Sequence, residues 1–275
     1  MSALYGRTVV VELGPEGGRG TRIEGLRVHF RIEHSSAPEP NRGVVELYNP
    51  APTTIALARA PRSLVRVLAG YNNVERQIGQ GEPVRNGVAV RTQGPDRVLR
   101  IEFADGGRAY ASTLLNLSWS TSTTFAQLVD QVLVATRWAR GPITADLSGT
   151  LPYGGHFVGR PRELLDRICP LLRPRGAIWH VRDGALVITP RGGSTPESVP
   201  LISSASGNLV GSPGPTETGV QLVALLDDSV RPGRRVQLQS RDYSGTFTVT
   251  DATFVGDSGF ETPFYVEATG TLEAA

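Results

Sequence analysis

The stretch LRVHFRI at residues 26–32 decides the fold class of this sequence. Its apolar and basic side chains alternate, which is the pattern of a strand with one buried face. Further β-rich stretches lie before and after it at a spacing of about ten residues, separated by Gly, Pro and Asn. This spacing predicts a closed or strongly curved antiparallel sheet. The other stretches are residues 7–13, 44–48, 64–69, 77–83, 88–92 and 98–103.

The hydrophobic period changes from two to that of a helix after residue 108. Apolar residues at helical spacing predict a helix over residues 124–138, and Thr124 with Gln127 fits a capping box at its start. A second helix is expected to begin at Pro161 and to kink or end at Pro170. Two apolar runs then flank Asp183-Gly184, which predicts a hairpin with a type I′ turn.

Residues 191–218 are rich in Gly, Ser, Pro and Thr and predict a linker or long loop. Strands are expected again from residue 219 to 271, and the long run 245–255 is expected to need a partner for its backbone groups. The predicted fold class is therefore mainly β with an α/β insertion. Two antiparallel β-domains (1–108 and 193–275, the second including the linker) flank a small helix-plus-hairpin domain (109–192).

Composition excludes several classes of protein. The chain has 275 residues with a net charge of +2, too small to make nucleic acid or an anionic membrane the default partner. No apolar run approaches the ~18 residues of a membrane span, and the first residues do not resemble a signal peptide. A single cysteine, Cys169, excludes an intrachain disulfide and every zinc site built from several cysteines.

No catalytic, cofactor or metal site is predicted. The segment Gly256-Asp257-Ser258-Gly259 matches the tetrapeptide around the nucleophile of trypsin-like proteases, but the histidine context is missing and only a short stretch follows Ser258. We interpret it as a turn. Cys169 lies in an apolar helical stretch and is expected to pack in the core. The four histidines show no metal-ligand spacing.

Five residues are candidates for contacts with partner proteins. Arg231, Arg234 and Arg235 surround a Pro-Gly turn, which predicts a solvated turn. Trp179 and His180 alternate in a strand, and His180 is expected at a surface or an interface.

Taken in order, the strand sequences resemble those of phage baseplate hub proteins. That family opens with an "F-x-I" strand, an "I-x-L/I-Y-N" strand, then "V-x-V-x-A-G-Y" and "I-F-x-G". The resemblance covers nearly the whole chain, although Gly79 stands where the family has Phe and the chain is short for the group. The matching segments are residues 25–33, 45–50, 65–71, 78–81, 105–106, 157–166, the hairpin at Trp179, and 219–257.

This resemblance implies that both β-domains are tube-like and that three chains form a homotrimeric ring, the central hub of the baseplate. The turn at Arg231, Arg234 and Arg235 is then expected at the rim of the ring, where guanidinium groups pair with carboxylates on a partner. The ring would join the tail tube, or a distal tail protein, to the central spike and would contact other baseplate (wedge) proteins. DNA would pass through its lumen without specific binding. The protein would be made in the host cytoplasm and reside in the virion tail, with no cofactor and no enzymatic activity.

Two alternatives from other classes stay open at this point. One is a tail-associated cell-wall hydrolase or protease, which needs a convergent set of acid and base residues. The other is a monomeric β-rich carbohydrate-binding or adhesin module, which only a measurement of the assembly state separates from a hub.

Overall fold

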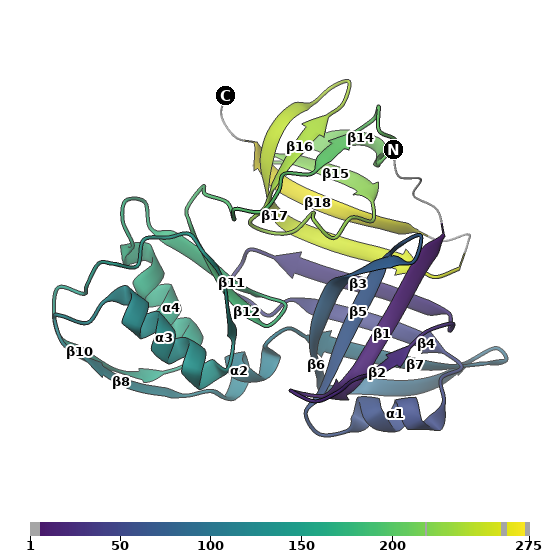
Figure 1. Cartoon of the computed structure of the whole chain (residues 1–275), viewed down its shortest axis with the longest axis horizontal. Helices are drawn as coiled ribbons and strands as arrows, with labels where there is room; N and C mark the ends of the chain where they lie inside the picture. The colour runs from purple at the N-terminus through teal and green to yellow at the C-terminus, as the bar shows by residue number, and fades with distance from the viewer. Residues whose placement is uncertain (1–5, 218, 260–262, 273–275) are drawn as a thin grey trace.

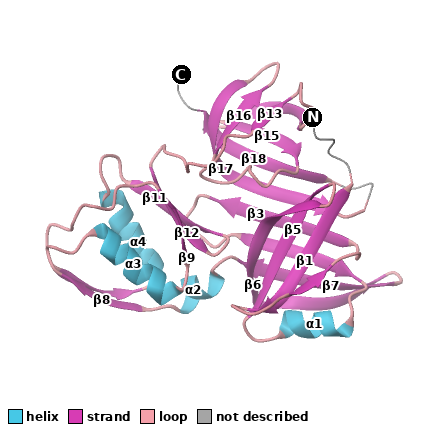
Figure 2. Ribbon diagram, in the orientation of Figure 1, coloured by secondary structure: helices cyan, strands magenta, loops and turns pink. Residues whose placement is uncertain are grey.

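The computed structural model describes residues 6–217, 219–259 and 263–272. Three parts follow one another along the chain, and Figure 1 shows them as separate regions of the molecule. The N-terminal β part (7–104) contains β1–β7 and α1, the α/β part (107–190) contains α2–α4 and β8–β12, and the C-terminal β part (201–272) contains β13–β18. The predicted fold class is confirmed, and strands dominate the ribbon in Figure 2.

The elements have the following bounds. The strands of the N-terminal β part are β1 Arg7–Pro15, β2 Thr21–Ile23, β3 Val28–Ser35, β4 Arg42–Tyr48, β5 Ser63–Tyr71, β6 Val74–Gln93 and β7 Asp96–Ala104, with α1 at Pro52–Arg59. The α/β part has α2 Gly107–Ser112, β8 Leu115–Trp119, α3 Phe125–Thr136, β9 Ala139–Ile143, β10 Gly155–Gly159, α4 Pro161–Ile168, a 3₁₀ turn Cys169–Leu171, β11 Ala177–Arg182 and β12 Ala185–Pro190. The C-terminal β part has β13 Leu201–Ser203, β14 Leu209–Pro215, β15 Val220–Leu225, β16 Arg235–Gln239, β17 Ser244–Asp257 and β18 Phe264–Leu272.

The two β parts share one sheet. Its strand order is β14-β15-β18-β17-β3-β4-β7-β6-β5-β1-β2, with β13 and β16 attached beside β17. Strand β3, which contains most of the stretch LRVHFRI, pairs with β4 on one side and with β17 on the other. The boundaries 1–108, 109–192 and 193–275 stay a prediction, but the backbone ladder runs without a break from the N-terminal to the C-terminal β part.

The backbone groups of β17 are paired inside the chain. Its first half bonds to β16, its second half to β3, and its other edge to β18. The expectation that the run 245–255 needs an outside partner is therefore wrong. The alternating pattern identified the strand, but it could not indicate that β3, more than 200 residues earlier, would cover its edge.

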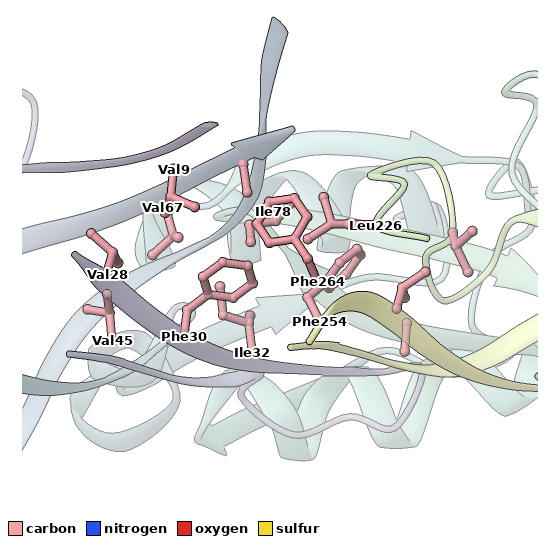
Figure 3. Packing of buried hydrophobic residues seen from close by; sticks show 14 of the residues in the cluster. Val9, Val28, Phe30, Ile32, Val45, Val67, Ile78, Leu226, Phe254 and Phe264 are labelled. Carbon is pink, nitrogen blue, oxygen red and sulfur yellow. The ribbon is translucent and has the colours of Figure 1, made fainter. Parts of the chain in front are cut away.

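One apolar core lies beneath this shared sheet. Figure 3 shows Phe30 and Ile32 of β3 among Phe254 and Phe264 of the C-terminal β part. The rings of Phe30 and Phe264 meet edge to face with centroids 5.9 Å apart. Because aromatic and branched side chains contribute the most buried area, this cluster ties the two β parts together.

The α/β part has its own core. The apolar faces of α3 and α4 pack on β11 and β12, and the described residues of the cluster come from positions 109–188 only. The predicted capping box at Thr124 and Gln127 is confirmed. Helix α4 ends at Ile168 and continues as a 3₁₀ turn through Pro170, as expected of a proline that cannot donate to the helix.

Two local expectations were incomplete. The segments 77–83 and 88–92 are one strand, β6, because residues 84–87 form a bulge in the ladder with β7 rather than a break. The stretch 191–218 contains β13 and β14, short strands that pair with β16 and β15. Their Gly, Ser and Pro content hides the alternation on which sequence prediction depends.

Candidate functional site: the junction of the three parts

The hairpin of β11 and β12 docks on both β parts through its turn. Asp183 and Gly184 have φ of 52° and 73°, which confirms the type I′ turn. The Gly184 amide donates to Asp105 Oδ1 at 2.8 Å, and Asn41 Nδ2 donates to the Val181 carbonyl at 2.8 Å. The turn is thus held by residues at the end of β7 and before β4.

Arg231 connects the same turn to the C-terminal β part. Its Nη1 donates to Asp183 Oδ2 at 2.8 Å, and its Nε donates to the Asp228 carbonyl at 3.0 Å. Its remaining Nη2 donates to the carbonyl of Gln77 on β6. One guanidinium therefore contacts all three parts, and a planar fork with five donors is suited to this role.

Two histidines complete what we call the junction cluster: His34, Asp105, His180, Asp183 and Arg231. His34 Nε2 donates to the Ile78 carbonyl at 2.7 Å, and its ring meets Phe254 edge to face. His180 is 1% exposed, and neither ring nitrogen has a hydrogen-bond partner among the described residues.

Burial dominates the electrostatics of the junction cluster. It raises the pKa of Asp105 to about 8, helped by the nearby Asp183 carboxylate. Burial also lowers the pKa of His34 to about 4 and of His180 to about 3, and neighbouring arginine charges act in the same direction. At neutral pH the two histidines and Asp105 are therefore uncharged. Arg231 and Asp183 form an ion pair beside them.

Three of the five predicted contact residues, Trp179, His180 and Arg231, are buried in the folded chain. Arg231 is 5% exposed, so the expectation of a solvated side chain is wrong for this residue. His180 is buried because the loop before β16 covers the second face of β11. A Cβ atom added to Gly233 in this loop would lie 3.5 Å from the imidazole. Trp179 lies in the α/β core and donates from Nε1 to Asp166 Oδ1 at 2.8 Å.

The other two predicted residues lie closer to solvent. Arg234 is partly buried and donates from Nη2 to the Ser198 carbonyl at 3.2 Å; burial lowers its pKa. Arg235 is exposed at the start of β16. Of the predicted contact set, these two retain a side chain that another molecule can reach.

Sequence reasoning missed Asp105, Asp183, His34 and Gln77 as members of the site. The Asp183-Gly184 turn was identified, but the docking partners of the hairpin lie up to 140 residues away, as in the Asn41–Val181 bond. Arg231 and Gln77 are 154 residues apart. No spacing rule connects such positions.

The other residues considered for chemistry have structural contacts. Ser258 Oγ accepts from the Val28 amide at 3.0 Å, and the neighbouring Asp257 pairs with Arg27. Cys169 is 1% exposed, as predicted, and burial raises the pKa of its thiol to about 12. Within the described ranges there is no group of three or more His, Cys, Asp or Glu side chains that could hold a metal ion. None of the described helices is long and apolar enough to cross a membrane.

No protein-family model matches this sequence, and no curated protein matches it. Solved structures match nearly the whole chain. The 43 kDa tail protein of prophage MuSo2 from Shewanella oneidensis has a TM-score of 0.66 at 10% identity, covering 97% of this chain and 98% of that one. The tail protein from Neisseria meningitidis MC58 has a TM-score of 0.67 at 12% identity, covering 97% of this chain and 96% of that one.

The chain has the fold of phage tail proteins. The resemblance to phage hubs noted in the sequence is thereby confirmed at the level of the fold. The phage tail fold extends to a component of the type VI secretion system of E. coli, with a TM-score of 0.61 at 11% identity, covering 95% of this chain and 77% of that one. That protein is itself described as structurally similar to the T4 tail proteins gp27 and gp5.

Proposed function

We propose that this chain is a structural component of a phage tail and forms the central hub of the baseplate. Three copies make a ring that joins the tail tube, or a distal tail protein, to the central spike. The ring encloses part of the channel for DNA and contacts other baseplate proteins. Its place is the virion tail, after synthesis in the cytoplasm of the bacterial host.

The observation that carries this proposal is the end-to-end match with two tail proteins. Coverage of 96–98% on both sides leaves little of either chain outside the common fold. Because one fold hosts many functions, the match alone does not fix the role. The interior of this molecule adds to it, because buried polar groups join its three parts to one another, as suits a structural protein.

A non-catalytic role agrees with the contacts of the reactive groups. The Ser258 hydroxyl is engaged with the backbone of β3, and the Cys169 thiol is buried with a raised pKa. A nucleophile needs the opposite conditions, namely a neighbouring base or a lowered pKa.

Multi-angle light scattering of the purified chain tests the ring. We expect a mass of about 88 kDa, three times the 29.4 kDa of one chain, alone or with a tube or spike protein present. Negative-stain images of the same sample should show closed rings. A mass of one chain under both conditions would contradict the hub and favour the adhesin alternative. A hydrolytic activity that disappears in Ser258→Ala would favour the protease.

A further inference from the structure

A groove of about 1020 Å³ opens around the bulge in β6, between the end of α1 and the start of α2. Its size is at the upper end of the ~300–1,000 Å³ typical of small-molecule sites, so it has room for a short stretch of polypeptide. Seven arginines and three glutamates line it. The groove is therefore strongly positive, although the whole chain carries only +2.

Four of the seven arginines already have carboxylate partners. Arg31 pairs with Glu33, and Arg100 with Glu46 and Glu102. Arg62 and Arg108 share Glu16, and Arg108 also pairs with Glu82. These pairs neutralise the charge of four arginines and fix their side chains along the walls.

The other three, Arg42, Arg59 and Arg85, are exposed. None of their guanidinium groups makes an ion pair or a hydrogen bond with any residue in the described part of the chain. They come from β4, from the last turn of α1 and from the β6 bulge. Three elements thus converge on one groove with three uncompensated positive charges.

The backbone of β6 is also open at this place. Its first half, Val74–Gly81, pairs with β5, whereas its second half has described partners on β7 only. The ladder register jumps from Pro83 to Val88, so residues 84–87 leave the ladder at the groove. Free amide and carbonyl groups on such an edge can accept one further extended segment.

We propose that this groove binds an extended, acidic segment of a partner protein. Carboxylates of the segment would pair with Arg42, Arg59 and Arg85, and its backbone would follow the open edge of β6. Pro61, Pro83 and Val84 give the groove apolar walls, which suit intervening aliphatic side chains. The inference goes beyond the proposed function and does not depend on the trimer.

Duplex DNA fits this groove less well than a peptide. A duplex needs a broad basic surface along which many phosphates are neutralised, whereas the uncompensated charge here comes from three arginines confined to one groove.

The test uses the full chain and a fluorescently labelled peptide of alternating glutamate and valine. Its binding is followed by anisotropy over a series of salt concentrations. We expect binding that weakens with salt, and a loss of affinity of about tenfold or more in the triple variant Arg42→Gln/Arg59→Gln/Arg85→Gln. Each exposed ion pair contributes a few-fold in affinity, so three together give this factor.

A matched triple variant controls for the change in net charge. Arg173→Gln/Arg175→Gln/Arg241→Gln removes three exposed arginines that do not line the groove. It should bind the peptide like the unmodified chain. Equal losses in the two triple variants would show that only net charge matters and would overturn the proposal.

Three other outcomes would also overturn it. The first is no peptide binding by the unmodified chain. The second is binding of a labelled DNA duplex, but not of the peptide, through the same three arginines. The third is a change of mass in the groove variant, which would make a second copy of this chain the occupant. Mass and peptide binding are measured separately, so a chain that binds the peptide but stays a monomer with and without the tube or spike protein would contradict the hub and leave this inference standing.

Discussion

Asp105 illustrates at the scale of one residue how burial sets the chemistry of the junction. Its ordinary pKa of 3.8 is raised to about 8 in the folded chain, so the native protein holds a proton that the unfolded chain has lost. The free energy of unfolding therefore falls as pH rises through this interval, by up to about 1.4 kcal/mol per pH unit.

The histidines act in the opposite direction at lower pH. The pKa values of His34 and His180 are lowered from 6.5, so between their folded values and pH 6.5 the unfolded chain binds more protons than the native one. Stability rises with pH there. The effect of Asp105 is therefore expected to be visible without opposition between about pH 6.5 and 8.

Asp105→Asn tests this assignment. The amide keeps an oxygen for the Gly184 amide but has no proton to lose. In urea unfolding followed by circular dichroism, the unmodified chain should lose stability from about pH 6.5 to 8, and the variant should not. Asp242→Asn, at an exposed position, is the control and should keep the original slope. An unchanged slope in Asp105→Asn would contradict the raised pKa.

At the scale of elements, three phenylalanine rings cover glycines of neighbouring strands. Phe103 of β7 lies over Gly43 of β4, Phe30 of β3 over Gly256 of β17, and Phe247 of β17 over Gly270 of β18. The second pair sits where the two β parts meet, because Phe30 and Gly256 are directly opposite in the ladder. A glycine in a strand commonly marks such a close approach.

Gly256→Ala is expected to destabilise the chain by about 1–3 kcal/mol, since its methyl group would overlap the ring of Phe30. Gly20→Ala is the control, because the nearest atom to its Cβ position is 3.6 Å away. That variant should be neutral or slightly stabilising. Thermal unfolding of both variants gives the comparison, and equal melting temperatures would show that β3 and β17 can separate enough to admit a methyl group.

The elements that sequence analysis predicted are those specified by neighbouring residues. A type I′ turn requires two positive φ values, which Asp and Gly adopt readily, so Asp183-Gly184 alone indicates the turn type. The capping box of Thr124 and Gln127 lies within one helical turn. Trp179 and His180 show where this kind of reasoning ends. Alternation gives β11 one inner and one outer face, but the loop carrying Gly233 buries the outer face too. Such coverage depends on tertiary contacts that no local pattern records.

At the scale of the whole molecule, the two cores are separate, and the polar junction connects them. The three tryptophans, Trp119, Trp138 and Trp179, all belong to the α/β part, and the β parts have none. Tryptophan fluorescence therefore reports on the α/β part, while the β signal of circular dichroism reports mainly on the shared sheet.

We expect the two signals to give different midpoints in urea, since separate cores open as separate cooperative units. Arg231→Met, which removes a guanidinium that contacts all three parts, should move the midpoints further apart. Arg241→Met, at an exposed position, should leave their separation unchanged. Coincident midpoints in the unmodified chain would contradict the independence of the two cores.

The pairing of β3 with β17 also fixes the order in which the molecule can be completed on the ribosome. Val28 and Ser258, which bond across this seam, are 230 residues apart. At ~5–20 residues per second, β3 waits roughly 10–50 s for its neighbour to be synthesised. During that time the α/β part can already fold, whereas one edge of β3 and the apolar face around Phe30 are open to other chains. When many copies are made at once, these open surfaces favour aggregation of nascent chains. A chaperone bound to the N-terminal strands until β17 emerges would prevent it.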